Sequence, residues 1–148
     1  MILIAHRGLL NGPSSEMENK PSQIVKALEE GFDVEIDLWF EKDLKLGNDN
    51  PKYLISRQFL YDNPNLWVNC KNLKALEFCL DNDIHCFWHH IDDVCLTSKK
   101  IMWVYQEHKI TKKSIAVLPE HFMDIKNIKD LKCFGICSDF IKKIKNFN

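Results

Sequence analysis

The segment FDVEIDLWF, residues 32–40, alternates apolar and acidic residues from Phe32 to Leu38. This period of two is typical of a β-strand, and it places Asp33, Glu35 and Asp37 together on one face. On an exposed strand such acids would lie in water. The strands of a parallel sheet are usually covered on both faces, so buried acids there are expected to be paired, protonated or bound to a metal.

Strands and helices alternate along the rest of the chain. Short apolar runs bounded by turn residues predict further strands over 2–5, 45–48, 66–71, 84–89, 101–105, 114–118 and 133–140. Apolar periodicity and capping residues such as Asn72 predict helices over 23–30, 53–60, 73–81, 124–131 and 141–147.

This alternation predicts an α/β fold with parallel strand pairing. The number of strands suits a TIM-type (β/α) barrel, although such barrels rarely contain fewer than about 200 residues. We therefore expect residues 1–148 to form a single domain, a small or reduced TIM-type barrel with several short crossovers. An open, doubly wound sheet is the alternative architecture.

The composition narrows the classes of partner and location. The net charge is −1, with 20 Lys and Arg against 21 Asp and Glu, so no nucleic-acid partner is expected. We find no apolar run long enough for an integral membrane segment and no signal-peptide pattern at the first residues. None of the 6 cysteines forms a Cys-x-x-Cys pair, so we expect buried, reduced thiols and a cytoplasmic location. The oligomeric state stays open.

Polar residues also collect where predicted strands end. His6 and Arg7 follow the first strand, while Asn69 and Lys71 lie at the end of the strand that comes after the acidic one. The carboxyl ends of parallel strands meet at one edge of a sheet, where ligands bind in α/β folds. We therefore expect a binding site at this edge.

At these residues the sequence resembles the glycerophosphodiester phosphodiesterase family, part of the phospholipase C-like phosphodiesterase superfamily. The specific motifs lie in the first half of the chain, and the second half is similar to a compact, divergent branch of the superfamily. The matching motifs are His6-Arg7-Gly8, Glu18-Asn19, Glu35-Ile36-Asp37, Asn69-Cys70-Lys71 and residues 135–140.

The resemblance implies a TIM-type barrel that cleaves a glycerophosphodiester-like or other small phosphodiester with the help of Mg²⁺ or Ca²⁺. The metal ligands that it implies are Glu35, Asp37 and Asn69, whose oxygen atoms suit a hard divalent cation. Arg7 and Lys71 are the residues that it implies for holding the phosphate oxygens.

The resemblance also implies acid–base catalysis by two histidines. His6 titrates near neutral pH and is the expected general base. The position of the second histidine holds Asn48, which cannot donate a proton to a leaving group, so we assign the acid to His89. Four residues are expected to contact the substrate: Glu18, Asn19, Asn48 and Trp88.

Two functions therefore remain open. The first is a metal-dependent hydrolase, or a lyase in which a neighbouring substrate hydroxyl attacks the phosphorus. The second is a catalytically impaired protein of the same fold that binds a phosphate ester or sugar phosphate, because Asn48 and Asn69 are neutral. Asp139 lies either at the rim of the sheet or at the start of the last helix, and the helix cap is the favoured interpretation.

Overall fold

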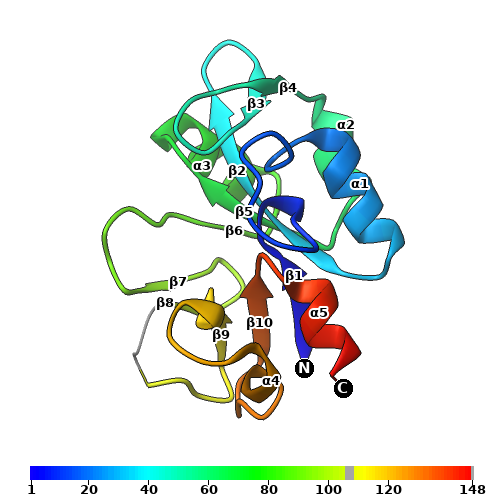
Figure 1. The fold of residues 1–148 in the computed structure, drawn as a ribbon. Helices are drawn as coiled ribbons and strands as arrows, with labels where there is room; N and C mark the ends of the chain where they lie inside the picture. The colour runs from blue at the N-terminus through cyan, green and yellow to red at the C-terminus, as the bar shows by residue number, and fades with distance from the viewer. Residues whose placement is uncertain (106–108, 148) are drawn as a thin grey trace.

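The computed structural model describes residues 1–105 and 109–147 (Figure 1). Within these residues, 10 strands form one mixed sheet. The strands are β1 (Ile2–Ala5), β2 (Asp33–Phe40), β3 (Leu44–Leu46), β4 (Tyr53–Leu54), β5 (Leu66–Cys70), β6 (Cys86–Phe87), β7 (Val94–Leu96), β8 (Met102–Tyr105), β9 (Ser114–Val117) and β10 (Gly135–Ser138). The helices are α1 (Pro21–Glu29), α2 (Arg57–Tyr61), α3 (Leu73–Asp81), α4 (Ile125–Ile128) and α5 (Ile141–Asn146), with 3-10 turns η1 (His6–Gly8) and η2 (Pro119–His121).

The central strands run parallel to one another in the order β6-β5-β2-β1-β10-β9-β8. At one end of this series, β7 pairs antiparallel with β8. At the far end of β2, β3 and β4 add an antiparallel extension. Figure 1 shows β1 in the middle of the fold, between the part that holds β2 to β6 and the part that holds β7 to β10.

The sheet is strongly curled, because strands from its two ends touch through their side chains. The Trp103 ring of β8 lies 4.6 Å from the Phe87 ring of β6 and 5.8 Å from the Trp67 ring of β5, measured between centroids. After β7, the backbone N–H of Ser98 donates a hydrogen bond to the carbonyl of Cys86 on β6, at 2.8 Å. The sheet is thus a curled half-barrel, and we call its concave side the inner face.

The strand side chains separate into two apolar clusters. The outer cluster lies between the sheet and the helices and includes Ile24 of α1, Phe78 of α3 and Ile144 of α5. The inner cluster lies on the concave side and consists of Ile4, Trp67, Phe87, Trp103, Ile115, Val117 and Cys137. Both faces of the sheet therefore bury apolar surface, and this burial is the main driving force for folding.

Helices α1, α2 and α3 begin at residues that satisfy or remove free N–H groups. Asn72 Oδ1 accepts a hydrogen bond from the Ala75 N–H at 3.0 Å at the start of α3. Ser56 Oγ accepts one from the Phe59 N–H at 3.1 Å at the start of α2. Pro21 opens α1, where its missing N–H costs nothing.

The prediction of a TIM-type (β/α) barrel is wrong. The sheet is mixed and curls into a half-barrel with few helices. Strands β6 and β8 are connected through the antiparallel β7, and β9 and β10 through η2 and the short α4. Because the chain also uses residues between β2 and α2 for β3 and β4, too few remain for a full helix after every strand. The alternative of an open, doubly wound sheet also differs from the structure, since strand side chains rather than helices fill the inner face.

Most predicted elements are present with shifted ends. The predicted strand over 2–5 coincides with β1, and the acidic strand begins at Asp33 rather than at Phe32. The strand predicted over 84–89 shortens to β6, and the helix predicted over 53–60 is replaced by β4 and α2. Strand β7 has no counterpart among the predicted elements.

Gly135 provides a test of the packing between β1, β10 and β9. A Cβ atom there would lie 2.8 Å from the Ile2 carbonyl oxygen and 2.9 Å from Ile115 Cδ1. We expect Gly135→Ala to lower the free energy of unfolding by about 1–3 kcal/mol, because the strands must move apart. The matched control Leu54→Ala, at an exposed side chain of β4, should change it by less than about 0.5 kcal/mol. Urea unfolding measures both, and equal stability of Gly135→Ala and the wild type would contradict this packing.

Candidate active site

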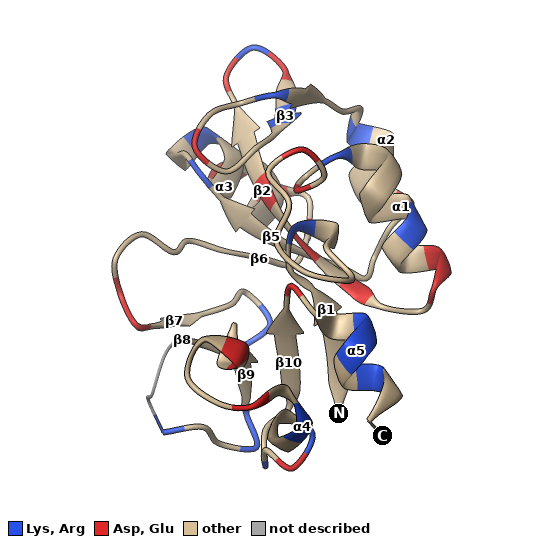
Figure 2. Cartoon of the chain, in the orientation of Figure 1, with Lys and Arg blue, Asp and Glu red and all other residues tan. Residues whose placement is uncertain are grey.

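The strand register gathers the predicted polar residues on the inner face. In the parallel pair β2–β5, Glu35 is opposite Trp67 and Asp37 is opposite Asn69. Residues opposite each other on paired strands point to the same side of the sheet. Because Trp67 belongs to the inner cluster, Glu35, Asp37 and Asn69 also point inward. Figure 2 shows acidic residues of β2 and a basic residue of η1 near the middle of the fold.

The carboxylate of Asp37 is the centre of this group. Its Oδ2 accepts a hydrogen bond from Asn19 Nδ2 and its Oδ1 accepts one from Asn69 Nδ2, each at 2.8 Å. Arg7 Nε lies 3.0 Å from Oδ2, and Lys71 Nζ lies 3.8 Å from Oδ1. Asp37 is fully buried, so these groups replace the water that a carboxylate needs. Asp37 thereby brings together four other residues that the sequence assigns to the site.

Arg7 reaches Asp37 through the turn η1. Its φ angle is +51°, a left-handed conformation that costs a non-glycine residue about 1–2 kcal/mol. The Arg7 backbone N–H donates to Glu35 Oε2 at 3.1 Å, and its Nη1 donates to Glu18 Oε2 at 2.8 Å. Burial acts to lower the pKa of Arg7, but the charges of Asp37 and Glu35 outweigh burial and raise this pKa above its usual value. The guanidinium is therefore charged and held in one place.

His6 forms a buried pair with Asp139. Its Nδ1 lies 2.7 Å from Asp139 Oδ1, and its Nε2 lies 3.9 Å from Glu35 Oε2. Burial acts to lower the pKa of His6, but the hydrogen bond to Asp139 and the charge of Glu35 raise it overall. Glu120 Oε1 accepts hydrogen bonds from the Asp139 N–H at 2.9 Å and from Ser138 Oγ at 2.7 Å, which fixes the end of β10.

The favoured interpretation of Asp139 as a helix cap is wrong. The N-cap position of α5 is Phe140, and no side chain caps this helix. Asp139 follows the inner-face residue Cys137 by two positions, and it carries on that alternation at the rim of the sheet. This parity was the signal in the sequence that Asp139 lies beside His6.

Glu35 and Asn69 offer oxygen atoms that suit a divalent cation. Glu35 is 2% exposed, and burial followed by the charge of Asp37 raises its pKa to about 7. A nearby cation would stabilise its charged form. Asn69 Oδ1 is buried and accepts no hydrogen bond within the described part of the chain. Oxygen donors of this kind are the ligands that hard divalent cations prefer, whereas both oxygens of Asp37 already contact protein donors.

His89 lies at the side of the site formed by β8. Its ring stacks on Tyr105 with centroids 4.1 Å apart, and its Nε2 lies 2.7 Å from the Asp92 carbonyl oxygen. Burial lowers the pKa of His89, and the positive charge of Lys71 contributes. Burial and then the charge of Glu35 raise the pKa of Tyr105. Tyr105 is therefore a residue beside the site that the sequence analysis did not identify. Trp88, which was expected to contact the substrate, is 41% exposed.

Asn48 lies at the edge of the site rather than within the Asp37 group. Its Nδ2 donates to Asp49 Oδ1 at 3.1 Å. The preceding Gly47 N–H donates to the Asp37 carbonyl at 3.1 Å, which ties this loop to β2. Asn48 and Glu18 share a polar cavity of about 210 Å³, which is lined by Ser15, Glu18, Gly47, Asn48, Asp49, Asn50, Lys52 and Tyr53.

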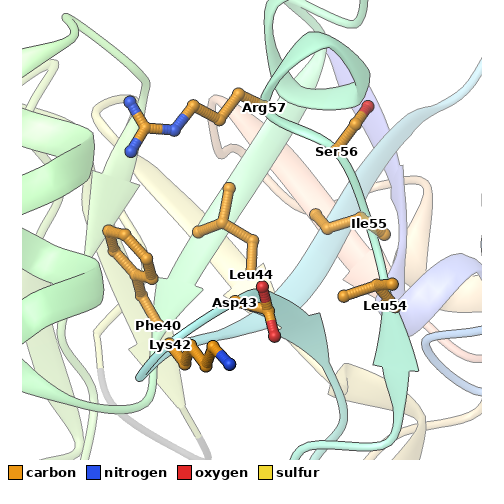
Figure 3. Close-up of a pocket in the computed structure, with 8 residues that line it drawn as sticks. All are labelled: Phe40, Lys42, Asp43, Leu44, Leu54, Ile55, Ser56 and Arg57. Atoms are coloured by element: carbon orange, nitrogen blue, oxygen red, sulfur yellow. The ribbon is translucent and has the colours of Figure 1, made fainter.

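A larger cavity of about 400 Å³ lies beside β3, β4 and α2 (Figure 3). Its lining combines the apolar side chains of Phe40 and Leu44 with the charged side chains of Asp43 and Arg57, as Figure 3 shows. None of its lining residues is assigned to the site by the sequence, and none contacts Asp37 through the hydrogen bonds and ion pairs described above.

Comparison with protein-family models, with curated proteins and with solved structures finds no match to this chain. Among the helices in residues 1–105 and 109–147, none has the length and apolar character needed to cross a membrane.

Removal of the Asp37 carboxylate tests its central position. We expect Asp37→Ala to lower the free energy of unfolding by about 3–5 kcal/mol, because Arg7 and its neighbours then lose a buried charged partner. The matched control Asp81→Ala removes an exposed carboxylate at the last residue of α3, so its unfolding midpoint should stay close to that of the wild type. Chemical denaturation measures both variants. Similar midpoints for the two variants would contradict the central role of Asp37.

The pH dependence of stability tests the burial of Glu35. Folding raises its pKa from 4.5 to about 7, so the folded protein binds this proton more tightly than the unfolded chain. Stability should therefore fall as pH rises between these values, by up to about 3 kcal/mol, and the raised pKa of His6 acts in the same direction. Glu35→Gln should weaken this pH dependence, whereas Glu77→Gln, at an exposed position of α3, should retain it. Unfolding curves at several pH values that are the same for Glu35→Gln and wild type would contradict the assignment.

Proposed function

We propose that this protein is a metal-dependent phosphodiesterase that hydrolyses a small, glycerophosphodiester-like substrate. The observation that carries the proposal is the buried His6–Asp139 pair, at 2.7 Å, next to Glu35 and the charged Arg7. Acid–base cleavage of a phosphodiester needs a side chain that transfers a proton and cations that stabilise negative charge, and an imidazole beside carboxylates and cations provides both.

Arg7 and Lys71 are the residues that we assign to the phosphate. Both lie at the same carboxylate of Asp37, which holds their positive charges at one point of the rim. A phosphodiester carries a negative charge that repels a nucleophile, so cations at its oxygens lower the barrier to attack. Because Glu18 accepts from Arg7 Nη1, it orients the guanidinium rather than binding the phosphate itself.

Glu35 and Asn69 are the residues that we assign to Mg²⁺ or Ca²⁺, with Asp37 as a third ligand only if its protein donors move aside. When bound, the cation neutralises phosphate charge and lowers the pKa of a bound hydroxyl. The high pKa of Glu35 supports this assignment, because a neighbouring cation would relieve the cost of its buried charge.

The pKa values of His6 and His89 shift in opposite directions, which favours catalytic roles opposite to those expected from the sequence. The pKa of His6 is raised, so its imidazolium persists near neutral pH and fits the general acid. The pKa of His89 is lowered by burial, so its neutral ring fits the general base. Asp139 stabilises the protonated His6 and fixes which ring nitrogen faces the site.

Turnover of glycerophosphocholine with Mg²⁺ or Ca²⁺ tests the proposal. A chelator should abolish turnover, and His6→Gln should lower kcat by about 10² to 10⁴-fold. The matched control His121→Gln changes an exposed histidine of η2 and should leave turnover unchanged. Turnover that is indifferent to both the chelator and His6→Gln would contradict the mechanism.

A nitrophenyl diester separates the two roles of histidine. Nitrophenol needs little protonation as a leaving group, so loss of an acid should matter much less for bis(4-nitrophenyl) phosphate than for glycerophosphocholine. We expect this difference for His6→Gln and not for His89→Gln. The reverse result would restore the assignment made from the sequence.

The second candidate function is a protein that binds a phosphate ester without cleaving it. Asn48 stands where a proton donor is expected, and the Asp37 oxygens are occupied by protein donors, which favours this function. Calorimetric binding of glycerophosphocholine without turnover, together with turnover in Asn48→His, would support it.

The 6 free cysteines support a reducing compartment, and we propose the cytoplasm.

A further inference from the structure

Three cysteines lie together on the outer side of the sheet. Cys70 ends β5, Cys79 lies in α3, and Cys86 begins β6. Their Sγ atoms all lie within 4.8 Å of one another, and their exposures are 1%, 0% and 1%. The other three cysteines of the chain are not part of this group.

The strand register explains why these side chains meet. Cys86 is opposite Val68 in the parallel pair β5–β6, and Cys70 lies two residues beyond Val68 on the same face. The side chains on this face belong to the outer cluster, which α3 covers. Cys79 of α3 therefore packs against the two strand cysteines. Asn69 points to the opposite face, and the sheet therefore separates the thiols from the candidate active site.

We propose that Cys70, Cys79 and Cys86 form a binding site for a thiophilic metal ion, and that Cu(I) is the ion that fits it best. Soft sulfur ligands select such ions over Mg²⁺ or Ca²⁺. Three sulfurs at about 2.3 Å from a central ion lie about 4.0 Å apart, so a small contraction of the cluster is enough.

The number of donors distinguishes Cu(I) from Zn²⁺. A structural zinc site has four ligands, usually in a tetrahedron. Among the described residues, no His, Asp or Glu joins the three cysteines. The surroundings are mostly apolar side chains of the outer cluster, including Val68 and Phe78, and the Ser98 Oγ accepts a hydrogen bond from the Cys86 N–H at 3.0 Å. A three-coordinate, all-sulfur site is typical of Cu(I) rather than of zinc.

Loading of the site replaces S–H bonds with S–Cu bonds. Because thiolates rather than thiols are metal ligands, the three thiol protons leave to solvent as three sulfur–copper bonds form. The copper enters and stays as Cu(I), so no oxidant or reductant is needed.

Anaerobic titration of the reduced protein with Cu(I) tests this site, with bicinchoninate as the competing chelator. Because the thiols are buried, Cu(I) is also added during refolding. We expect the wild type to retain one equivalent of Cu(I) and to melt at a higher temperature when loaded. X-ray absorption at the copper edge should report sulfur neighbours only.

Single variants separate this site from the other thiols. Cys70→Ala, Cys79→Ala and Cys86→Ala should each lose the retained copper, while Cys137→Ala, at an equally buried cysteine of the inner face, should keep it. Circular dichroism checks that each variant folds. The proposal is overturned if the folded wild type retains no Cu(I), if Cys137→Ala loses as much copper as the cluster variants, or if copper has nitrogen or oxygen neighbours.

Discussion

Asp37 has a carboxylate from which water is excluded, and the chain surrounds it with hydrogen-bond donors and cations from several segments. Asn19 comes from the loop before α1, Arg7 from η1, and Asn69 and Lys71 from the end of β5 and the residue after it. A buried carboxylate with fewer partners would be costly, so these segments are held in place together. The positions of the two cations at the rim follow from this one constraint.

The inner face has an apolar layer of aromatic side chains and a polar layer at the carboxyl ends of the strands. The apolar layer keeps water away from the polar one. Trp67, Phe87 and Trp103 close the curl of the sheet and exclude water from its concave side. Polar residues at the carboxyl ends of the same strands then lie in surroundings of low polarity. This explains why burial is the leading cause of the raised pKa of Glu35 and of the lowered pKa of His89.

Local patterns predicted the strands better than their arrangement. The alternation around Asp37 and the cap at Asn72 are properties of neighbouring residues, and both are present in the structure. The contact between Phe87 and Trp103 joins distant strands, and no local pattern specifies it. A half-barrel therefore could not be distinguished from a TIM-type barrel by the order of elements alone.

Only part of the site was predicted, because sequence patterns indicate local structure but not which distant segments meet. Residues near the ends of parallel strands, such as His6 and Asn69, could be expected at one rim. Asp139 was assigned to a helix cap, because the same residue type serves both purposes and only the strand parity separates them. The three clustered thiols went unnoticed, because Cys70, Cys79 and Cys86 match no short spacing motif and meet only when α3 packs on the sheet.

Diffraction from crystals soaked in Mn²⁺, with data collected at the manganese absorption edge, tests most directly whether this rim is a cation site beside His6. The anomalous signal should show an ion within ligand distance of Glu35 and of Asn69 Oδ1, with Arg7 still paired to Asp37. An ion held by Asp37 in place of Arg7, or manganese bound elsewhere with none at this rim, would contradict the proposed arrangement.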